Sequence, residues 1–147
     1  MSLTGVQAIA LVTGAFLSGA MMSVSFVAVP AMLDTTIEAS HLRTQWARLY
    51  HYGHHVLPAI AVGTCLLHMY TALSKGRLFA LAGITTVGIA PFTWVFMAAT
   101  NVELFRLGAQ PLGQADMSRV RELVVKWTWL HVARSLLPLV GAIIALS

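Results

Sequence analysis

The last apolar segment of the chain carries two polar side chains where a membrane helix normally carries none. Residues 127–146 are long and apolar enough to cross a bilayer, yet they include His131 and Arg134. A cation in hydrocarbon costs ~2.5 kcal/mol or more, so such a residue usually faces protein or water and often marks a functional site. Trp127, His131 and Arg134 follow one another at intervals of four and three residues, which places them on one helical face. The segment therefore predicts a membrane helix whose polar face points into a bundle.

The composition also indicates a membrane protein. Hydrophobic residues make up 58% and charged residues 10% of the 147 residues, whereas soluble domains average about 25% charged residues. The formal net charge of +4 comes without a basic run or a nucleic-acid motif, so we assign it to loops near lipid head groups and expect no nucleic-acid partner. The single cysteine, Cys65, excludes an internal disulfide and a cysteine-based metal site.

Four apolar segments are long enough to be membrane helices, and the chain has room for one domain. We expect residues 1–147 to form a single all-α domain, a four-helix transmembrane bundle. The predicted spans are residues 3–29, 56–73, 78–99 and 127–146, each approximate. The first segment lacks the basic leading residues of a cleaved signal peptide and is too long for one, so we expect it to be retained.

Shorter features join these spans. The polar stretch at residues 34–55 repeats aromatic and small residues at helical spacing, which predicts a short interfacial helix before the second span. We expect Pro30 to end the first span and Pro91 to kink the third. A turn is predicted at residues 108–113, where glycine and proline are frequent.

Polar residues from all four spans should meet at one end of the bundle. Successive helices alternate in direction, so the ends of spans one and three lie beside the starts of spans two and four. The polar and aromatic residues brought to that end are Ser25, Tyr50, His51, His54, His55, Asn101, Glu103, Trp127, His131 and Arg134. The sequence therefore predicts a half-buried pocket, which a substrate dissolved in the membrane could enter sideways.

Several of these residues also have a purely structural interpretation. Arg134 could be only the counter-ion of Glu103 and a donor to backbone carbonyls freed by a proline, and His131 could be a hydrogen-bonded packing residue. His51 and His55 have an i, i+4 spacing that suits a metal ion. The other residues of a zinc-protease motif are missing, so we expect no metal site.

Four motifs, in this order along the chain, resemble the anthrone oxygenase family of small four-helix membrane proteins from fungal aromatic polyketide pathways. They are Val29-Pro30, Trp46-x-x-x-Tyr50-x-x-Gly53, Thr100-Asn101-Val102-Glu103-Leu104 and Trp127-x-x-x-His131-x-x-Arg134. The resemblance implies oxidation of an anthrone, such as emodin anthrone, to an anthraquinone. It also implies molecular oxygen as co-substrate and no metal or flavin cofactor.

The chemistry of such a substrate defines what the protein must supply. The doubly benzylic CH₂ of an anthrone is acidic because its anion is delocalised into the ring ketone, and this anion can pass an electron to oxygen. The protein then needs a base, a stabiliser for the enolate oxygen and an apolar slot. We expect His131 to be the base, with His54 or His55 in reserve. Arg134 is expected to stabilise the anthrolate oxygen and Asn101 to bind a substrate oxygen.

The remaining expectations concern substrate binding, partners and location. The candidate substrate-binding residues are Trp127, Tyr50, His54, His55 and Glu103. Trp127 and Tyr50 would position the flat ring system. The expected partners are a hydrophobic aromatic polyketide and the lipid bilayer, while a homo-oligomer or contacts with pathway enzymes stay open. The endoplasmic reticulum or a related endomembrane is the expected location.

Other classes of function also fit parts of the sequence. A haem-binding membrane cytochrome would use His54 or His55 together with His131 as axial ligands. A different enzyme of polyketide metabolism would use the same base and cation for a cyclisation or an isomerisation. A non-enzymatic bundle that binds lipids or partner enzymes is disfavoured, because it would have little reason to retain Arg134.

Overall fold

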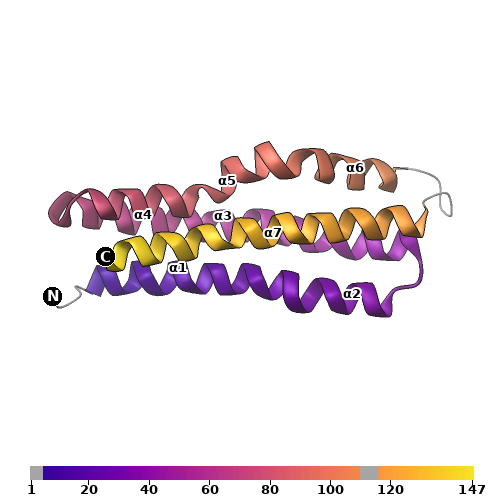
Figure 1. Cartoon of the computed structure of the whole chain (residues 1–147), viewed down its shortest axis with the longest axis horizontal. Coiled ribbons are helices and arrows are strands. Elements are labelled where there is room, and N and C mark those ends of the chain that lie inside the picture. Colours follow the sequence, from indigo (N-terminus) through magenta and orange to yellow (C-terminus); the bar gives the residue numbers. More distant parts are fainter. Residues whose placement is uncertain (1–4, 110–115) are drawn as a thin grey trace.

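All regular elements in the described part of the chain are helices (Figure 1). The computed structural model describes residues 5–109 and 116–147. Four helical segments within these ranges are long and apolar enough to cross a membrane, namely Gly5–Thr35, Ala39–Lys75, Arg77–Gly108 and Met117–Leu146. The predicted all-α, four-helix membrane protein is therefore confirmed. The predicted start of the first span at residue 3 and most of the turn at 108–113 lie outside the described residues.

The four segments run side by side as one elongated bundle (Figure 1). In chain order the elements are α1 (Gly5–Ser23), η1 (Val24–Ala28), α2 (Val29–Thr35), α3 (Ala39–Lys75), α4 (Arg77–Val87), α5 (Ile89–Phe92), η2 (Thr93–Met97), α6 (Ala98–Gly108) and α7 (Met117–Leu146). The start of α1 and the end of α7 lie at the same end of the bundle as the α3–α4 turn. That turn is made at Gly76, whose φ of 103° favours glycine over other residues.

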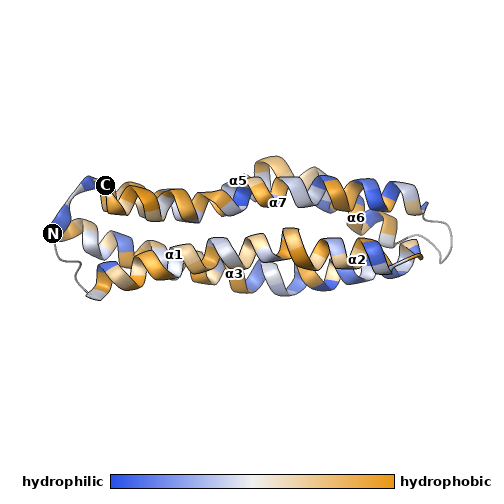
Figure 2. Cartoon of the chain, turned by 60° about the horizontal axis from the view of Figure 1, so that its bottom comes forward, coloured by the Kyte–Doolittle hydropathy of each residue, from blue (hydrophilic) through white to orange (hydrophobic). Residues whose placement is uncertain are grey.

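The second span is part of a longer helix, α3. Residues 39–55, within the region predicted as an interfacial helix, form the beginning of α3 and continue into the second span without a break. Its 37 residues measure about 55 Å at ~1.5 Å per residue, whereas the hydrocarbon core of a bilayer is ~30 Å thick. Hydrophilic residues become more frequent toward the α2 and α6 end of the bundle (Figure 2). This end therefore extends beyond the hydrocarbon into the head-group region.

The sequence predicted that the first span ends at Pro30, but the helix continues beyond this proline. A wide π-helical turn, η1, precedes the proline, and the backbone N–H of Val29 donates to the carbonyl of Val24, five residues earlier. Pro30 then falls in the first turn of α2, where its missing N–H is tolerated, and the helix continues to Thr35.

The third span is broken near Pro91, as predicted. A turn at Gly88 separates α4 from the short helix α5, and the π-helical segment η2 follows. The path of the helix shifts sideways at α5 before α6 continues toward the other end of the bundle (Figure 1). Proline is a common cause of such kinks, because it cannot donate a backbone hydrogen bond.

The half of the bundle near the termini is closely packed through small residues. An added Cβ at Gly141 of α7 would lie 2.7 Å from the carbonyl oxygen of Ala82 and 2.5 Å from the Thr86 hydroxyl, both on α4. An added Cβ at Gly83 would lie 3.2 Å from the carbonyl oxygen of Cys65 on α3. Close backbone approach at small residues is a usual way for membrane helices to associate.

The last helix, α7, starts from a capped end. The carboxylate of Asp116 accepts hydrogen bonds from the hydroxyl and the backbone N–H of Ser118. These two bonds hold the pKa of Asp116 below its ordinary value. From this cap α7 runs the length of the bundle and brings Trp127, His131 and Arg134 to its middle.

Candidate active site

A cavity of about 490 Å³ lies in the middle of the bundle, between α3, the α5–η2 segment and α7. Its volume is in the range of small-molecule binding sites, and most of the residues that line it are apolar. The polar and aromatic residues of its wall are Tyr50, Tyr52, His54, Thr93, Trp94, Asn101, Trp127, His131 and Arg134. The structure thus brings His131, Arg134, Asn101, Trp127, Tyr50 and His54, all candidates from the sequence, to one cavity.

Two of the sequence candidates lie elsewhere. Glu103 does not line the cavity, and both of its carboxylate oxygens accept hydrogen bonds of 2.9 Å from the guanidinium of Arg106. His55 is exposed and packs against His54, with 3.8 Å between the ring centroids, but it is not part of the cavity wall. Glu103 is therefore not the counter-ion of Arg134, because its charge is used one turn along its own helix.

Arg134 is the cation of the cavity. Its Nη1 donates to the Thr93 hydroxyl at 2.6 Å, while its Nε is buried and has no hydrogen-bond partner among the described residues. Within those residues, no carboxylate forms an ion pair with it. A partly buried cation without an anion is costly, so the position favours a ligand that carries or develops negative charge.

His131 lies one helical turn before Arg134 and is 1% exposed. Its Nδ1 is 3.1 Å from the Ser25 hydroxyl, and its ring packs against the indole of Trp127 with 4.7 Å between centroids. No hydrogen bond within the described residues involves Nε2. The ring is therefore held on one edge and can interact with a ligand on the other.

Two further polar atoms of the wall have no partner. The Asn101 side-chain oxygen and the Trp127 indole N–H are buried without a hydrogen bond from the described residues. Buried polar groups are usually paired, so unpaired ones at a cavity suggest atoms that a ligand completes. One is an acceptor and the other a donor, which suits a ligand with both hydroxyl and carbonyl oxygens.

An aromatic cluster supports this wall from behind. Trp46 is fully buried and contacts Tyr50 and Trp127, with 5.4 Å and 6.1 Å between the ring centroids. Tyr50 in turn stacks on His54 at 5.1 Å. Because each ring is held by the next, Tyr50 and Trp127 present fixed faces to the cavity, as binding of a flat ring system requires.

The two π-helical turns place the hydroxyls that hold His131 and Arg134. Ser25 belongs to η1 and Thr93 to η2, and both turns pack against α7. π-helical turns are rare and often occur at functional sites. Ser25 was placed at this end of the bundle from the sequence, without a role, and Thr93 was not among the predicted residues. The signal that could have indicated them is a hydroxyl residue within a few positions of a proline in an apolar helix.

Comparison of the sequence with known proteins identifies the family. A family model described as anthrone oxygenase matches residues 46–144, which include the whole cavity apart from Val24. The chain belongs to the anthrone oxygenase family. This confirms the resemblance seen in the motifs.

Similar anthrone oxygenases cover almost the whole chain. The anthrone oxygenase AgnL2 of Paecilomyces divaricatus is 53% identical over 98% of this chain and 94% of its own length. The anthrone oxygenase dmxR16 of a Cryptosporiopsis species is 49% identical over 97% of this chain and 87% of its own length. An anthrone oxygenase of Claviceps purpurea is 44% identical, over 98% and 88%. No solved structure matches the chain.

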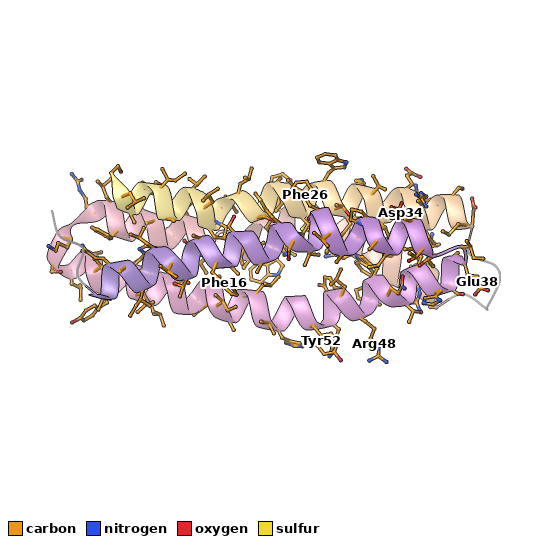
Figure 3. The ribbon with its side chains drawn as sticks, turned by 90° about the horizontal axis from the view of Figure 1, so that it is seen from below. Phe16, Phe26, Asp34, Glu38, Arg48 and Tyr52 are labelled. Atoms are coloured by element: carbon orange, nitrogen blue, oxygen red, sulfur yellow. The ribbon has the colours of Figure 1, made fainter. Side chains whose placement is uncertain are left out.

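In this member of the anthrone oxygenase family, the cavity opens on the side of the bundle. Tyr52 and Trp94 line the cavity although they are 63% and 75% exposed, which places the opening between α3 and η2. Tyr52 and Arg48 project from α3 away from the bundle (Figure 3). Since this is where α3 changes from charged to apolar residues, the opening lies near the boundary between hydrocarbon and head groups.

A group of histidines beside the opening could hold a metal ion. His51, His54 and His55 are exposed, and each has a ring nitrogen within 4.8 Å of a ring nitrogen of the other two. Imidazole is a common ligand of zinc and other transition metals. Only His54 of the three belongs to the cavity wall.

Proposed function

We propose that this chain oxidises the doubly benzylic CH₂ of an anthrone to the second ketone of an anthraquinone, with O₂. Membership of the anthrone oxygenase family supports the reaction. The observation that carries it at the site is Arg134, a cation with no carboxylate partner among the described residues, in the wall of a mostly apolar cavity. Such a site favours a flat, apolar molecule that becomes an anion during the reaction.

The reaction balances with these parts. A base removes one proton from the CH₂, and the electron pair is delocalised onto the ring oxygen to give the anthrolate. The anthrolate passes one electron to O₂, and the resulting radical and superoxide combine at the same carbon. Protonation gives a hydroperoxide. Loss of the remaining C–H proton and cleavage of the O–O bond then release water and leave the ketone.

The cavity supplies a candidate for each role. The imidazoles of His131 and His54 both lie in its wall. An imidazole is a common general base in enzymes. Arg134 would stabilise the anthrolate oxygen as its charge develops. Asn101 would accept a hydrogen bond from a substrate hydroxyl through its unpaired side-chain oxygen.

We also propose that O₂ is a co-substrate and that the chemistry needs no metal or flavin. The anthrolate is electron-rich enough to reduce O₂ directly, so the protein must make this anion and protect it rather than supply electrons of its own. The substrate would be a hydrophobic aromatic polyketide that reaches the side opening of the cavity from the bilayer. Within a cell, we propose the endoplasmic reticulum or a related endomembrane as the location of this multi-pass protein.

The alternatives considered from the sequence have less support. A haem-binding cytochrome would use His54 and His131, which both line the cavity, as axial ligands, but the three relatives described above are named anthrone oxygenases and none is named a cytochrome. A cyclisation or isomerisation would use the same base and cation, but the three relatives described above are all named for anthrone oxidation.

The proposal is tested with detergent-purified protein and emodin anthrone, under air and under nitrogen. Quinone formation is followed by absorbance against the rate without enzyme, and the same sample is scanned for a haem Soret band. We expect acceleration under air, none under nitrogen, and no Soret band. An uncatalysed rate in the presence of folded protein would refute the proposal, and a Soret band would support the cytochrome.

A further inference from the structure

The two histidines of the cavity wall are hydrogen-bonded in opposite senses. Nδ1 of His54 lies 3.1 Å from the backbone carbonyl oxygen of Tyr50. A carbonyl oxygen can only accept a hydrogen bond, so this nitrogen carries the proton. In the neutral ring of His54, Nε2 is then the unprotonated nitrogen and can take up a proton.

The partner of His131 is a hydroxyl, which can donate or accept. Ser25 is 2% exposed, and His131 is the only described residue with which its hydroxyl forms a hydrogen bond. If Nδ1 of His131 donated to Ser25, the hydroxyl proton would be buried without an acceptor, which is costly. The hydroxyl must therefore donate to Nδ1, and in the neutral ring the proton is on Nε2.

The hydroxyl of Ser25 makes no hydrogen bond within its own helix among the described residues. Hydroxyl residues in helices commonly donate to the carbonyl four residues earlier, as Ser135 does to His131 at 2.6 Å and Thr128 does to Val124 at 2.8 Å. Ser25 lies in η1 and makes no such bond within the described residues. Its hydroxyl proton remains available for the imidazole of His131.

We propose that His54 is the base of the reaction and that His131 is a hydrogen-bond donor to the anthrolate oxygen, together with Arg134. This rests on the proposed function. It makes the reserve base expected from the sequence, His54, the base and gives His131 the role of a donor instead. The substrate C–H bond breaks, its proton moves to Nε2 of His54, and the electron pair stays on the substrate. The charge that develops on the ring oxygen is met by the Nε2–H of His131 and the guanidinium of Arg134.

The distribution of charge favours this assignment. A base at position 131 would become a second cation one helical turn from Arg134, away from water, whereas a donor at that position stays neutral. His54 is exposed and can return its proton to water. The titratable groups that contact it are Tyr50, His51 and His55, all on α3.

The first test needs no substrate. Nitrogen-15 NMR of histidine-labelled protein, at a pH where the exposed histidines are neutral, distinguishes protonated from unprotonated ring nitrogens. His54→Gln and His131→Gln samples assign the two sets of signals. We expect the proton of His131 on Nε2 and that of His54 on Nδ1, with loss of the single-tautomer signal of His131 in Ser25→Ala. A proton on Nδ1 of His131 would overturn the proposal.

The second test separates a base from a donor by paired substitutions. Glutamine keeps an N–H donor but cannot act as a base, and leucine does neither. For His54, both variants should lose 10²–10⁴-fold in rate. For His131, leucine should lose about 10²–10³-fold, as is typical when an oxyanion donor is removed, and glutamine clearly less. Equal losses in the two His131 variants, with active His54→Gln, would overturn the assignment.

Exchange of the substrate CH₂ protons with D₂O under nitrogen isolates the proton-transfer step from oxidation. We expect His54→Gln to abolish catalysed exchange and His131→Gln to retain part of it. His41→Gln is the matched control, because His41 is an exposed histidine on the same helix, far from the cavity wall. If the unsubstituted protein catalyses neither exchange nor oxidation, the proposed function fails, whereas the tautomers are still decided by NMR.

Discussion

A cation without a carboxylate partner among the described residues, Arg134, determines the chemistry of the cavity. Arg134 is held by the hydroxyl of Thr93 and by no carboxylate among the described residues. Glu103, which could have neutralised it, instead pairs with Arg106. The cost of keeping this charge in a membrane helix is thus not recovered within the fold, as is expected of a group whose partner is the reacting substrate.

Replacing Arg134 with methionine should separate stability from activity. The rate of anthrone oxidation should fall by at least about 10²-fold, because one stabiliser of the oxyanion is lost. The thermal midpoint in detergent should stay the same or rise, because a desolvated cation is replaced by an apolar side chain of similar length. Activity assays and thermal unfolding of the same samples provide the measurement.

The control for this substitution is Arg106→Met, which breaks an exposed pair and should change both quantities little. A large drop in the thermal midpoint of Arg134→Met, without a greater loss of activity than in the control, would show that Arg134 is a structural residue.

Asn101 gives a second prediction at this scale. Its side-chain oxygen is buried without a partner in the described structure, so Asn101→Ala should leave the folded protein intact or slightly more stable. Loss of one hydrogen bond to the substrate, worth ~1 kcal/mol, should lower kcat/KM by about fivefold. Steady-state kinetics with folding checked by circular dichroism test this, and unchanged kinetics would remove Asn101 from the site.

Regular helices and π-helical turns occur in different halves of the bundle. In the half near the termini, α4 and α7 are regular and meet at Gly141, where backbone atoms come close. In the other half, η1 and η2 interrupt the first and third spans and direct Ser25 and Thr93 toward α7. Regular packing therefore supplies stability at one end, and local departures from it build the site at the other.

Gly141→Ala should destabilise the bundle. The added methyl group would lie within 2.7 Å of the carbonyl oxygen of Ala82 on a neighbouring helix, which leaves no room without a backbone shift. Overpacking of this kind costs ~1–3 kcal/mol. Thermal or denaturant unfolding in detergent measures the change.

Gly63→Ala is the matched control, because an added Cβ there meets no atom within 4 Å. That substitution should be neutral or stabilise the helix by ~0.5–1 kcal/mol. Equal stability of the two variants would show that α4 and α7 do not depend on the close approach at Gly141.

The sequence predicted the helices well because hydrophobic runs and spacing are local properties. Trp127, His131 and Arg134 were placed on one face from their intervals alone, and the structure has them together at the cavity. The roles of Ser25 and Thr93 could not be predicted, because they depend on π-helical turns, which hydrophobic runs and spacing do not indicate. Glu103 was wrongly assigned to the site, because the sequence does not show that its carboxylate accepts a hydrogen bond from Arg106.

Four helices from one chain surround a cavity that opens sideways between α3 and η2. Every group in the proposed mechanism comes from the chain itself. The histidines at 51, 54 and 55, beside the opening, are the part of the described structure best suited to hold a metal ion. The dependence of the reaction on a metal ion at these histidines can therefore be tested directly.

Removal of metal ions should not slow anthrone oxidation. Protein dialysed against a strong chelator is expected to keep its full rate, because the base, the cation and the substrate-derived anion suffice for the reaction. The rate and the metal content are measured on the same samples. Activity that is lost on chelation and restored by a divalent metal would contradict this prediction. If the same metal does not restore activity in His51→Ala/His55→Ala, the functional ion lies at these histidines.

The two π-helical turns matter for the active site but not for the length of the membrane spans. A π-helical turn contains one residue more than a regular α-helix needs. Deleting one residue other than Ser25 from Val24–Ala28 and one other than Thr93 from Thr93–Met97 would leave four spans still long enough for a bilayer. It would also convert each wide turn into a regular one and so move the hydroxyls at positions 25 and 93 relative to α7. A chain two residues shorter could thus remain a stable membrane bundle in which neither hydroxyl holds its partner on α7.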